Sequence, residues 1–87
     1  MRIVAAAIKI DGFVAMVPRP GRHHQILHRL ADGGYPTPIG GEQGFVTDAG
    51  TFVGRTRAMH IAIEAKQLIP REGQHGPGGH LFSEDVW

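Results

Sequence analysis

The first third of the chain alternates apolar runs with turn signals in a way that predicts a β-hairpin followed by a helix. Residues 2–9 form an apolar run typical of a buried strand, and residues 13–17 form the returning strand. Asp11-Gly12 between them is a strong hairpin signal, because glycine adopts a positive φ at little cost. From Arg22 the apolar positions fall at helical spacing, and Asp32-Gly33-Gly34 is expected to end that helix.

The next part of the chain repeats this order of elements. After a proline- and glycine-rich loop at 35–43, residues 44–47 and 51–53 predict a second hairpin. Apolar residues then recur every three or four positions from Arg55 to Leu68, which predicts an amphipathic helix that the following proline ends. The pattern therefore predicts an α+β fold of the order ββα–ββα, in which a small antiparallel sheet built from two hairpins packs with two helices.

The end of the sequence divides into a polar loop and an apolar tail. Residues 71–80 contain too little apolar surface to fold alone, and we expect them to form a flexible loop. The tail at 81–87 ends in Trp87, a side chain that is costly to leave in solvent, so the tail is expected to dock on the body or on a neighbouring subunit. Residues 1–87 as a whole are predicted to form a single ligand-binding domain.

Composition narrows the classes of function. The 87 residues include no cysteine, so no disulfide can compensate for a small core, and this favours oligomerisation. A formal net charge of +1 disfavours a general nucleic-acid binder. The longest apolar stretch, Ile3 to Ile8, is too short to span a membrane, and no signal-peptide pattern follows Met1-Arg2. These features predict a cytoplasmic protein with no membrane partner.

Cationic side chains mark two candidate anion sites. Arg19, Arg22 and His23 lie where the second strand gives way to the first helix, and free N–H groups with a positive dipole end favour phosphate there. The alternative is a rigid turn with solvated charges. Arg55 begins the second helix, where a positive charge opposes the dipole. An arriving anion would offset that penalty, and the alternative is a surface ion pair.

An aromatic residue and two carboxylates are further candidates. Phe45 follows a glycine-rich loop, so its ring is either a stacking platform for a nucleobase or an ordinary core residue. Glu84 and Asp85 lie in the tail, where they either accept hydrogen bonds from a base edge or ribose hydroxyl, or pair with arginines.

Neither an enzymatic activity nor a bound metal or cofactor is predicted. The sequence has no cysteine, and its only serine, Ser83, does not lie in a nucleophile-elbow motif. His24 and His28 have the i, i+4 spacing of metal ligands, but they belong to no H-E-x-x-H motif. Exposed or hydrogen-bonded histidines are the favoured interpretation.

Several segments together resemble a known family. They are RIVAAAIK at the start, R-H-H at 22–24, QGFVTDAGTFVGR at 43–55, the helical AIEAKQL, and LFSEDVW at the end. This combination resembles the first family of Thoeris anti-defence proteins, which phages encode. The resemblance implies a protein that sequesters the cyclic ADP-ribose isomer made by bacterial TIR proteins, in some members also cyclic oligonucleotides, without cleaving it. It also implies assembly as a dimer or a hexamer.

The resemblance also implies roles for individual residues. Phe45 would stack on adenine, Arg22 would meet the phosphates, and Asp85 would contact the base or ribose. Arg55 lies near a polar contact of the family, although Gly54 stands where Asp or Asn is expected. Glu84 stands where some members carry a basic residue.

Three other function classes remain open at this point. The first is a protein–protein interaction module, such as an inhibitor of a host enzyme. The second is a small nucleic-acid-binding accessory protein, whose affinity would fall steeply with salt. The third is an enzyme that uses a histidine and a carboxylate.

Overall fold

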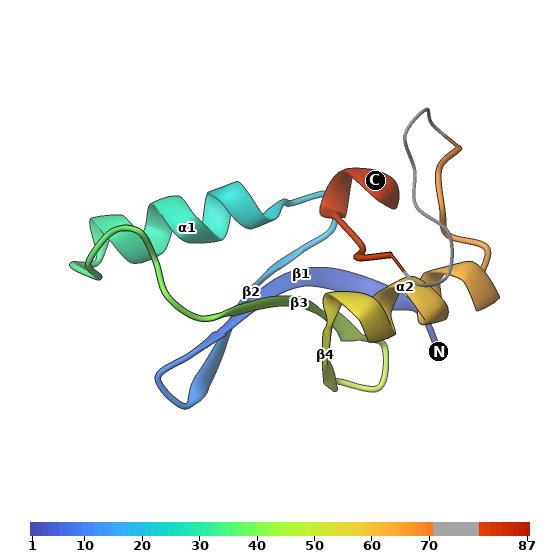
Figure 1. Ribbon diagram of the computed structural model, residues 1–87, viewed down its shortest axis with the longest axis horizontal. Coiled ribbons are helices and arrows are strands. Elements are labelled where there is room, and N and C mark those ends of the chain that lie inside the picture. The colour runs from blue at the N-terminus through green and yellow to red at the C-terminus, as the bar shows by residue number, and fades with distance from the viewer. Residues whose placement is uncertain (71–78) are drawn as a thin grey trace.

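The computed structural model describes residues 1–70 and 79–87. The elements, in chain order, are β1 (Ile3–Ile10), β2 (Phe13–Pro18), α1 (His23–Asp32), β3 (Glu42–Thr47), β4 (Phe52–Gly54), α2 (Arg55–Glu64) and the 3-10 turn η1 (Ser83–Asp85) (Figure 1). The predicted α+β fold is confirmed, with a four-stranded antiparallel sheet built from two hairpins that are each followed by a helix. Most of the loop expected at 71–80 lies outside the described residues.

The sheet has the order β2-β1-β3-β4, so that the two hairpins meet along β1 and β3. In the first hairpin Asp11 and Gly12 have φ values of 50° and 80°. This is the left-handed pair that a two-residue turn requires, and it confirms the hairpin signal. The turn between β3 and β4 likewise includes Gly50 at a φ of 80°.

Both helices and η1 lie on the same side of the sheet (Figure 1). Side chains alternate across a strand, so Ala6, Ile8 and Phe45 enter the core beneath the helices. The helices and the tail complete that core with buried apolar side chains, namely Ile26, Leu30, Ala58, Met59, Ile61, Ala62 and Leu81. Ala5 and Ala7 belong to a second cluster with Val46 and Phe52. β1 therefore buries alanines on both faces of the sheet.

The second helix is shorter than its periodicity predicts, and the expected end at Leu68 is wrong. α2 ends at Glu64, and Lys66 takes a left-handed φ of 56° that turns the chain away. The turn brings Gln67 to the start of β1, where its Oε1 accepts from Ile3 N at 2.8 Å and its Nε2 donates to Ile3 O at 2.9 Å. This pairing with a distant strand outweighs the local helical pattern.

The tail docks on the body of the chain, which confirms one of the two predicted placements. Leu81 is fully buried, and its N–H donates to Arg55 O at 3.2 Å. Ile69 N donates to Asp85 O at 2.8 Å, so the tail also contacts the segment that follows α2. The indole of Trp87 reaches Gly21, just before α1, where Nε1 donates to Gly21 O at 2.7 Å.

Gly44 is required by the packing of the second hairpin. A Cβ at this position would lie 2.6 Å from Cζ of Phe52 and would also collide with the main-chain oxygen of Val53. The ring of Phe52 therefore occupies the space above Gly44, where it covers the face of β3 opposite the helices.

Replacing Gly44 with alanine should therefore destabilise the protein. We expect Gly44→Ala to lower the free energy of unfolding by about 1–3 kcal/mol, the usual cost of overpacking, as measured by urea denaturation. Gly40→Ala is the matched control, because a Cβ there meets nothing within 4 Å. The control should change stability by less than about 0.5 kcal/mol. Equal losses in the two variants would contradict the packing role.

Candidate functional site

The start of α1 is the centre of the candidate site. Arg22 is the N-cap residue, with extended backbone at φ −129° and ψ 164°. Its N–H donates to Gln25 Oε1 at 2.7 Å, so a side chain of the first turn closes the helix start. The Arg22 side chain takes no part in this capping bond, and it extends to the tail of the chain.

His23 fastens the helix start to the sheet. The residue is buried, and its Nε2 lies 2.7 Å from Gly44 O in β3. Because a carbonyl oxygen only accepts, this nitrogen carries the hydrogen. Burial lowers the pKa of His23, the nearby Arg55 lowers it further, and the bond to Gly44 O partly opposes them. The neutral His23 ring therefore has a structural role, because it holds the start of α1 against β3.

Phe45 lies between His23 and the tail. The His23 ring meets Phe45 edge-on at 4.9 Å between centroids, and the Trp87 indole meets it edge-on at 6.3 Å. Phe45 is 0% exposed. The core alternative therefore describes Phe45 in this structure, and a base could stack on its ring only after Trp87 or His23 moved.

Trp87 is joined to the start of α1 by two hydrogen bonds. Its Nε1 donates to Gly21 O at 2.7 Å, and Arg22 Nη2 donates to Trp87 O at 2.6 Å. Arg22, which the sequence predicts to hold phosphate, thus holds a main-chain oxygen from 65 positions away. An anionic ligand would have to replace that oxygen.

A second arginine lies at the other side of the tail. Arg55 begins α2, donates through Nη2 to Gln43 Oε1, and places its guanidinium 4.7 Å from the centre of the Phe82 ring. Its Nε is buried and has no hydrogen-bond partner among the described residues. A buried N–H group without an acceptor lowers the stability of the fold by about 1–3 kcal/mol, and a ligand that supplies an acceptor would recover this free energy.

The remaining predicted residues divide between the edge of the site and the fold. Glu84 is exposed and near enough to His23 to affect its pKa, since its negative charge raises it. Asp85 is buried, and its Oδ2 accepts from Phe82 N at 2.8 Å, so this carboxylate shapes the tail. Arg19 is exposed in the turn after β2, and its own N–H donates to Val4 O.

Three residues of this neighbourhood were not predicted from the sequence. Trp87 was expected to dock, but not against Phe45 and Arg22. Gln43 and Phe82 contact Arg55 from two different elements. The β3–β4 hairpin pairs Gly44 with Gly54 and so brings Gln43 to Arg55, whereas the docking of the tail brings Phe82 and Trp87 to the site.

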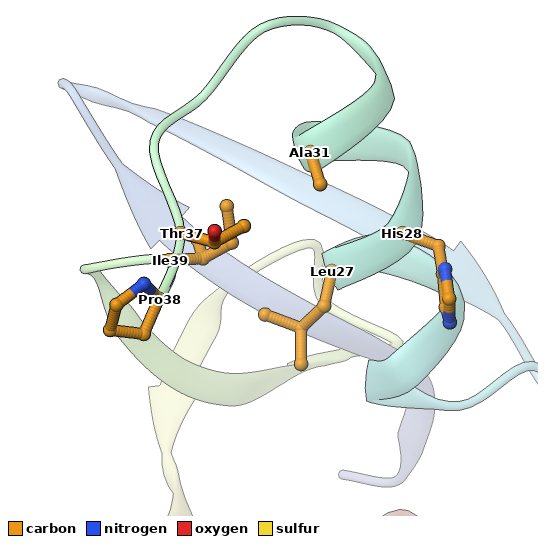
Figure 2. Close-up of a pocket in the computed structure, with 6 residues that line it drawn as sticks. All are labelled: Leu27, His28, Ala31, Thr37, Pro38 and Ile39. Atoms are coloured by element: carbon orange, nitrogen blue, oxygen red, sulfur yellow. The ribbon is translucent and has the colours of Figure 1, made fainter.

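A separate apolar pocket of about 320 Å³ lies between α1 and the loop that follows it. Figure 2 shows Leu27 and Ala31 of α1 facing the segment 37–39, with His28 at one side. The His24 and His28 rings lie 6.5 Å apart. No group of three or more metal-binding side chains occurs within residues 1–70 and 79–87. The pocket offers few charged groups, so the tail site is the better match for an anion.

Comparison with known proteins places this chain in a phage family. Residues 2–87 match the family model described as phage T4 y16D protein. The chain belongs to the phage T4 y16D protein family. No curated protein and no solved structure matches it significantly. Membership of the y16D family confirms the phage character that the sequence resemblance implied, while the anti-defence role stays a prediction.

The y16D-family match covers nearly the whole chain, so it includes every residue of the candidate site. Within the described residues, no helix has the length and apolar character needed to cross a membrane.

The buried His23 predicts a loss of stability in acid. Its pKa is lowered from 6.5, so the unfolded chain takes up this proton at a higher pH than the folded chain. The contribution of His23 is complete above about pH 6.5 and is lost as the pH falls toward the lowered pKa. Urea unfolding at about pH 7.5 and about pH 5.5 should show lower stability at acid pH, with a smaller difference in His23→Gln.

The matched control for this measurement is His24→Gln, which changes an exposed histidine in the same turn. This variant should keep the acid sensitivity of the unchanged protein. An undiminished pH difference in His23→Gln would show that other groups cause it.

Proposed function

We propose that this protein binds and sequesters a cyclic nucleotide immune signal, a cyclic ADP-ribose isomer or a cyclic oligonucleotide, without cleaving it. One observation carries the proposal. Arg22, at the start of a helix, binds the main-chain oxygen of Trp87, whose indole packs against Phe45. The tail therefore offers an oxygen acceptor and a flat aromatic ring side by side, as the phosphate and base of a nucleotide do.

The charges around the tail support an anionic ligand. Arg22 and Arg55 are both half-buried, and partial burial strengthens their attraction to phosphate relative to a fully solvated pair. Arg22 also lies at the positive end of α1. The Nε of Arg55, which has no hydrogen-bond partner among residues 1–70 and 79–87, supplies a further donor for a phosphate or ribose oxygen.

Binding by this route is an exchange between the tail and the ligand. The Trp87 contacts with Arg22, Gly21 and Phe45 are the ones that a nucleotide would replace. The bond to Arg22 and the contact with Phe45 each have a counterpart in a nucleotide, the first in its phosphate and the second in its base. The exchange also uncovers the ring of Phe45, which gives the base its stacking surface.

The surroundings of the reactive groups support binding without turnover. Ser83 is 2% exposed, which keeps its hydroxyl away from a ligand. The Nε2 of His23 is occupied by Gly44 O, and the carboxylate of Asp85 is turned to the tail backbone. The His23 and Asp85 side chains, which acid–base chemistry would use, thus have structural partners, and the Ser83 hydroxyl is buried.

A thermal-shift screen followed by mass spectrometry tests the proposal. The panel is cyclic ADP-ribose isomers, ADP-ribose, NAD, and cyclic di- and trinucleotides. A ligand at about 100 times its Kd adds about 2.7 kcal/mol, which should raise Tm by about 10 °C or more for a domain of this size. Heating the complex should then release the ligand with its mass unchanged.

Two variants connect the shift to the site. Arg22→Gln should lose most of the ligand-induced shift, because it removes the charge that meets the phosphate. Arg29→Gln removes an equal charge from an exposed position in the last turn of the same helix and should keep the shift. No shift with any cyclic nucleotide would refute sequestration, and release of a ligand with altered mass would show an enzyme instead.

A further inference from the structure

The outer strand of the sheet, β2, is an exposed apolar edge. β2 lies at one end of the strand order and, within the described part of the chain, pairs with β1 alone. Phe13, Val14 and Met16 are 43%, 37% and 48% exposed. These are three of the five large hydrophobic side chains that are most exposed in the described part of the chain. Such a concentration on one short strand indicates a surface that another strand covers.

Apart from Pro18 at its end, this edge lacks the features that usually prevent strand pairing. Residues 13–17 include no charged side chain and no proline. The register of β1 with β2 runs without a bulge from the Ala5–Pro18 pair to the Ile10–Phe13 pair. Proteins normally protect an edge with lysine, proline or a bulge, and an edge without them is a template for a further strand.

The hydrogen-bonding pattern fixes which residues face outward. Arg19 N donates to Val4 O, which makes Val4 and Arg19 a hydrogen-bonded pair. Bonded and non-bonded pairs alternate in an antiparallel ladder, so Val17, Ala15 and Phe13 also bond to β1. The main-chain N–H and C=O groups of Val14 and Met16 therefore point away from the sheet.

We propose that β2 pairs antiparallel with β2 of a second copy of this chain, about a twofold axis at Ala15. In this register Val14 lies opposite Met16 of the second copy, and the reverse pair is equivalent. Each of these pairs exchanges two main-chain hydrogen bonds, and the two four-stranded sheets become continuous. A register shifted by one residue would place the main-chain groups of Val14, which point away from the sheet, opposite those of Ala15, which point toward β1. The hydrogen bonds between the two copies would then be lost.

The side chains favour a second copy over an unrelated strand. Directly opposed residues share a face, so Val14 packs on Met16 of the second copy, and Phe13 lies over its Val17. The strand supplies the same donors, acceptors and apolar groups to both sides of the axis, as an isologous interface requires. The pairing covers all three exposed side chains of β2. It does not depend on the proposed ligand.

The mass of the protein in solution tests this pairing. Light scattering after size exclusion should give a mass of at least twice the 9.4 kDa of the chain. Val14→Lys places a charge on the exposed edge and should halve the mass without unfolding the chain. Met16→Pro removes an N–H that β1 does not use and should have the same effect. Ala49→Lys, in the exposed turn after β3, adds the same charge and should leave the mass unchanged.

A single cysteine tests the register, because the chain has none of its own. Ala15 would face Ala15 of the second copy in a non-hydrogen-bonded pair, with Cα atoms about 4.5 Å apart, which is within disulfide range. Ala15→Cys should form a cross-linked dimer under mild oxidation, and Ala49→Cys should not.

Three results would overturn the proposal. One is a monomeric mass for the unchanged protein at every concentration tested. Another is an oligomer whose mass survives both Val14→Lys and Met16→Pro, which would place the interface elsewhere. The third is an Ala15→Cys variant that cross-links no better than Ala49→Cys. The first of these results would leave a strand of a host protein as the occupant of β2.

Discussion

The candidate site depends on one buried contact, the hydrogen bond between His23 and the main-chain oxygen of Gly44. It holds the first turn of α1 against β3 at 2.7 Å and places the His23 ring edge-on to Phe45. With the helix start fixed there, Gly21 and Arg22 are in position to receive the tail. Burial keeps the ring neutral by lowering its pKa, so this arrangement is most stable above the pKa of an ordinary histidine.

The tail turns a small two-hairpin sheet into a protein with a distinct binding surface. Trp87 covers Phe45 and occupies Arg22, while Phe82 lies beneath Arg55. Both arginines therefore meet the same seven-residue segment from different elements. Figure 1 shows this segment closing over the side of the sheet that carries the helices. In the proposed function, the tail protects the site until a ligand takes over its contacts.

Much of the fold follows from local signals, whereas the site does not. Asp11-Gly12 defines a turn through its own backbone preference, so the first hairpin could be predicted without knowledge of the rest. The end of α2 could not, because Gln67 leaves the helix to bind Ile3 on a distant strand. Phe45 matched either a core residue or a stacking platform, and only its burial between His23 and Trp87 distinguishes them.

The fluorescence of Trp87 tests the central claim most directly, since Trp87 is the only tryptophan in the chain and lies in the site. The protein would be titrated with the cyclic nucleotide that it binds, and the indole emission would be recorded at saturation. If the ligand replaces the tail, the emission of Trp87 should shift to longer wavelength and iodide should quench it more easily, because the indole moves from Phe45 into solvent. A saturated complex with unchanged emission and quenching would contradict it, since the ligand would then lie elsewhere.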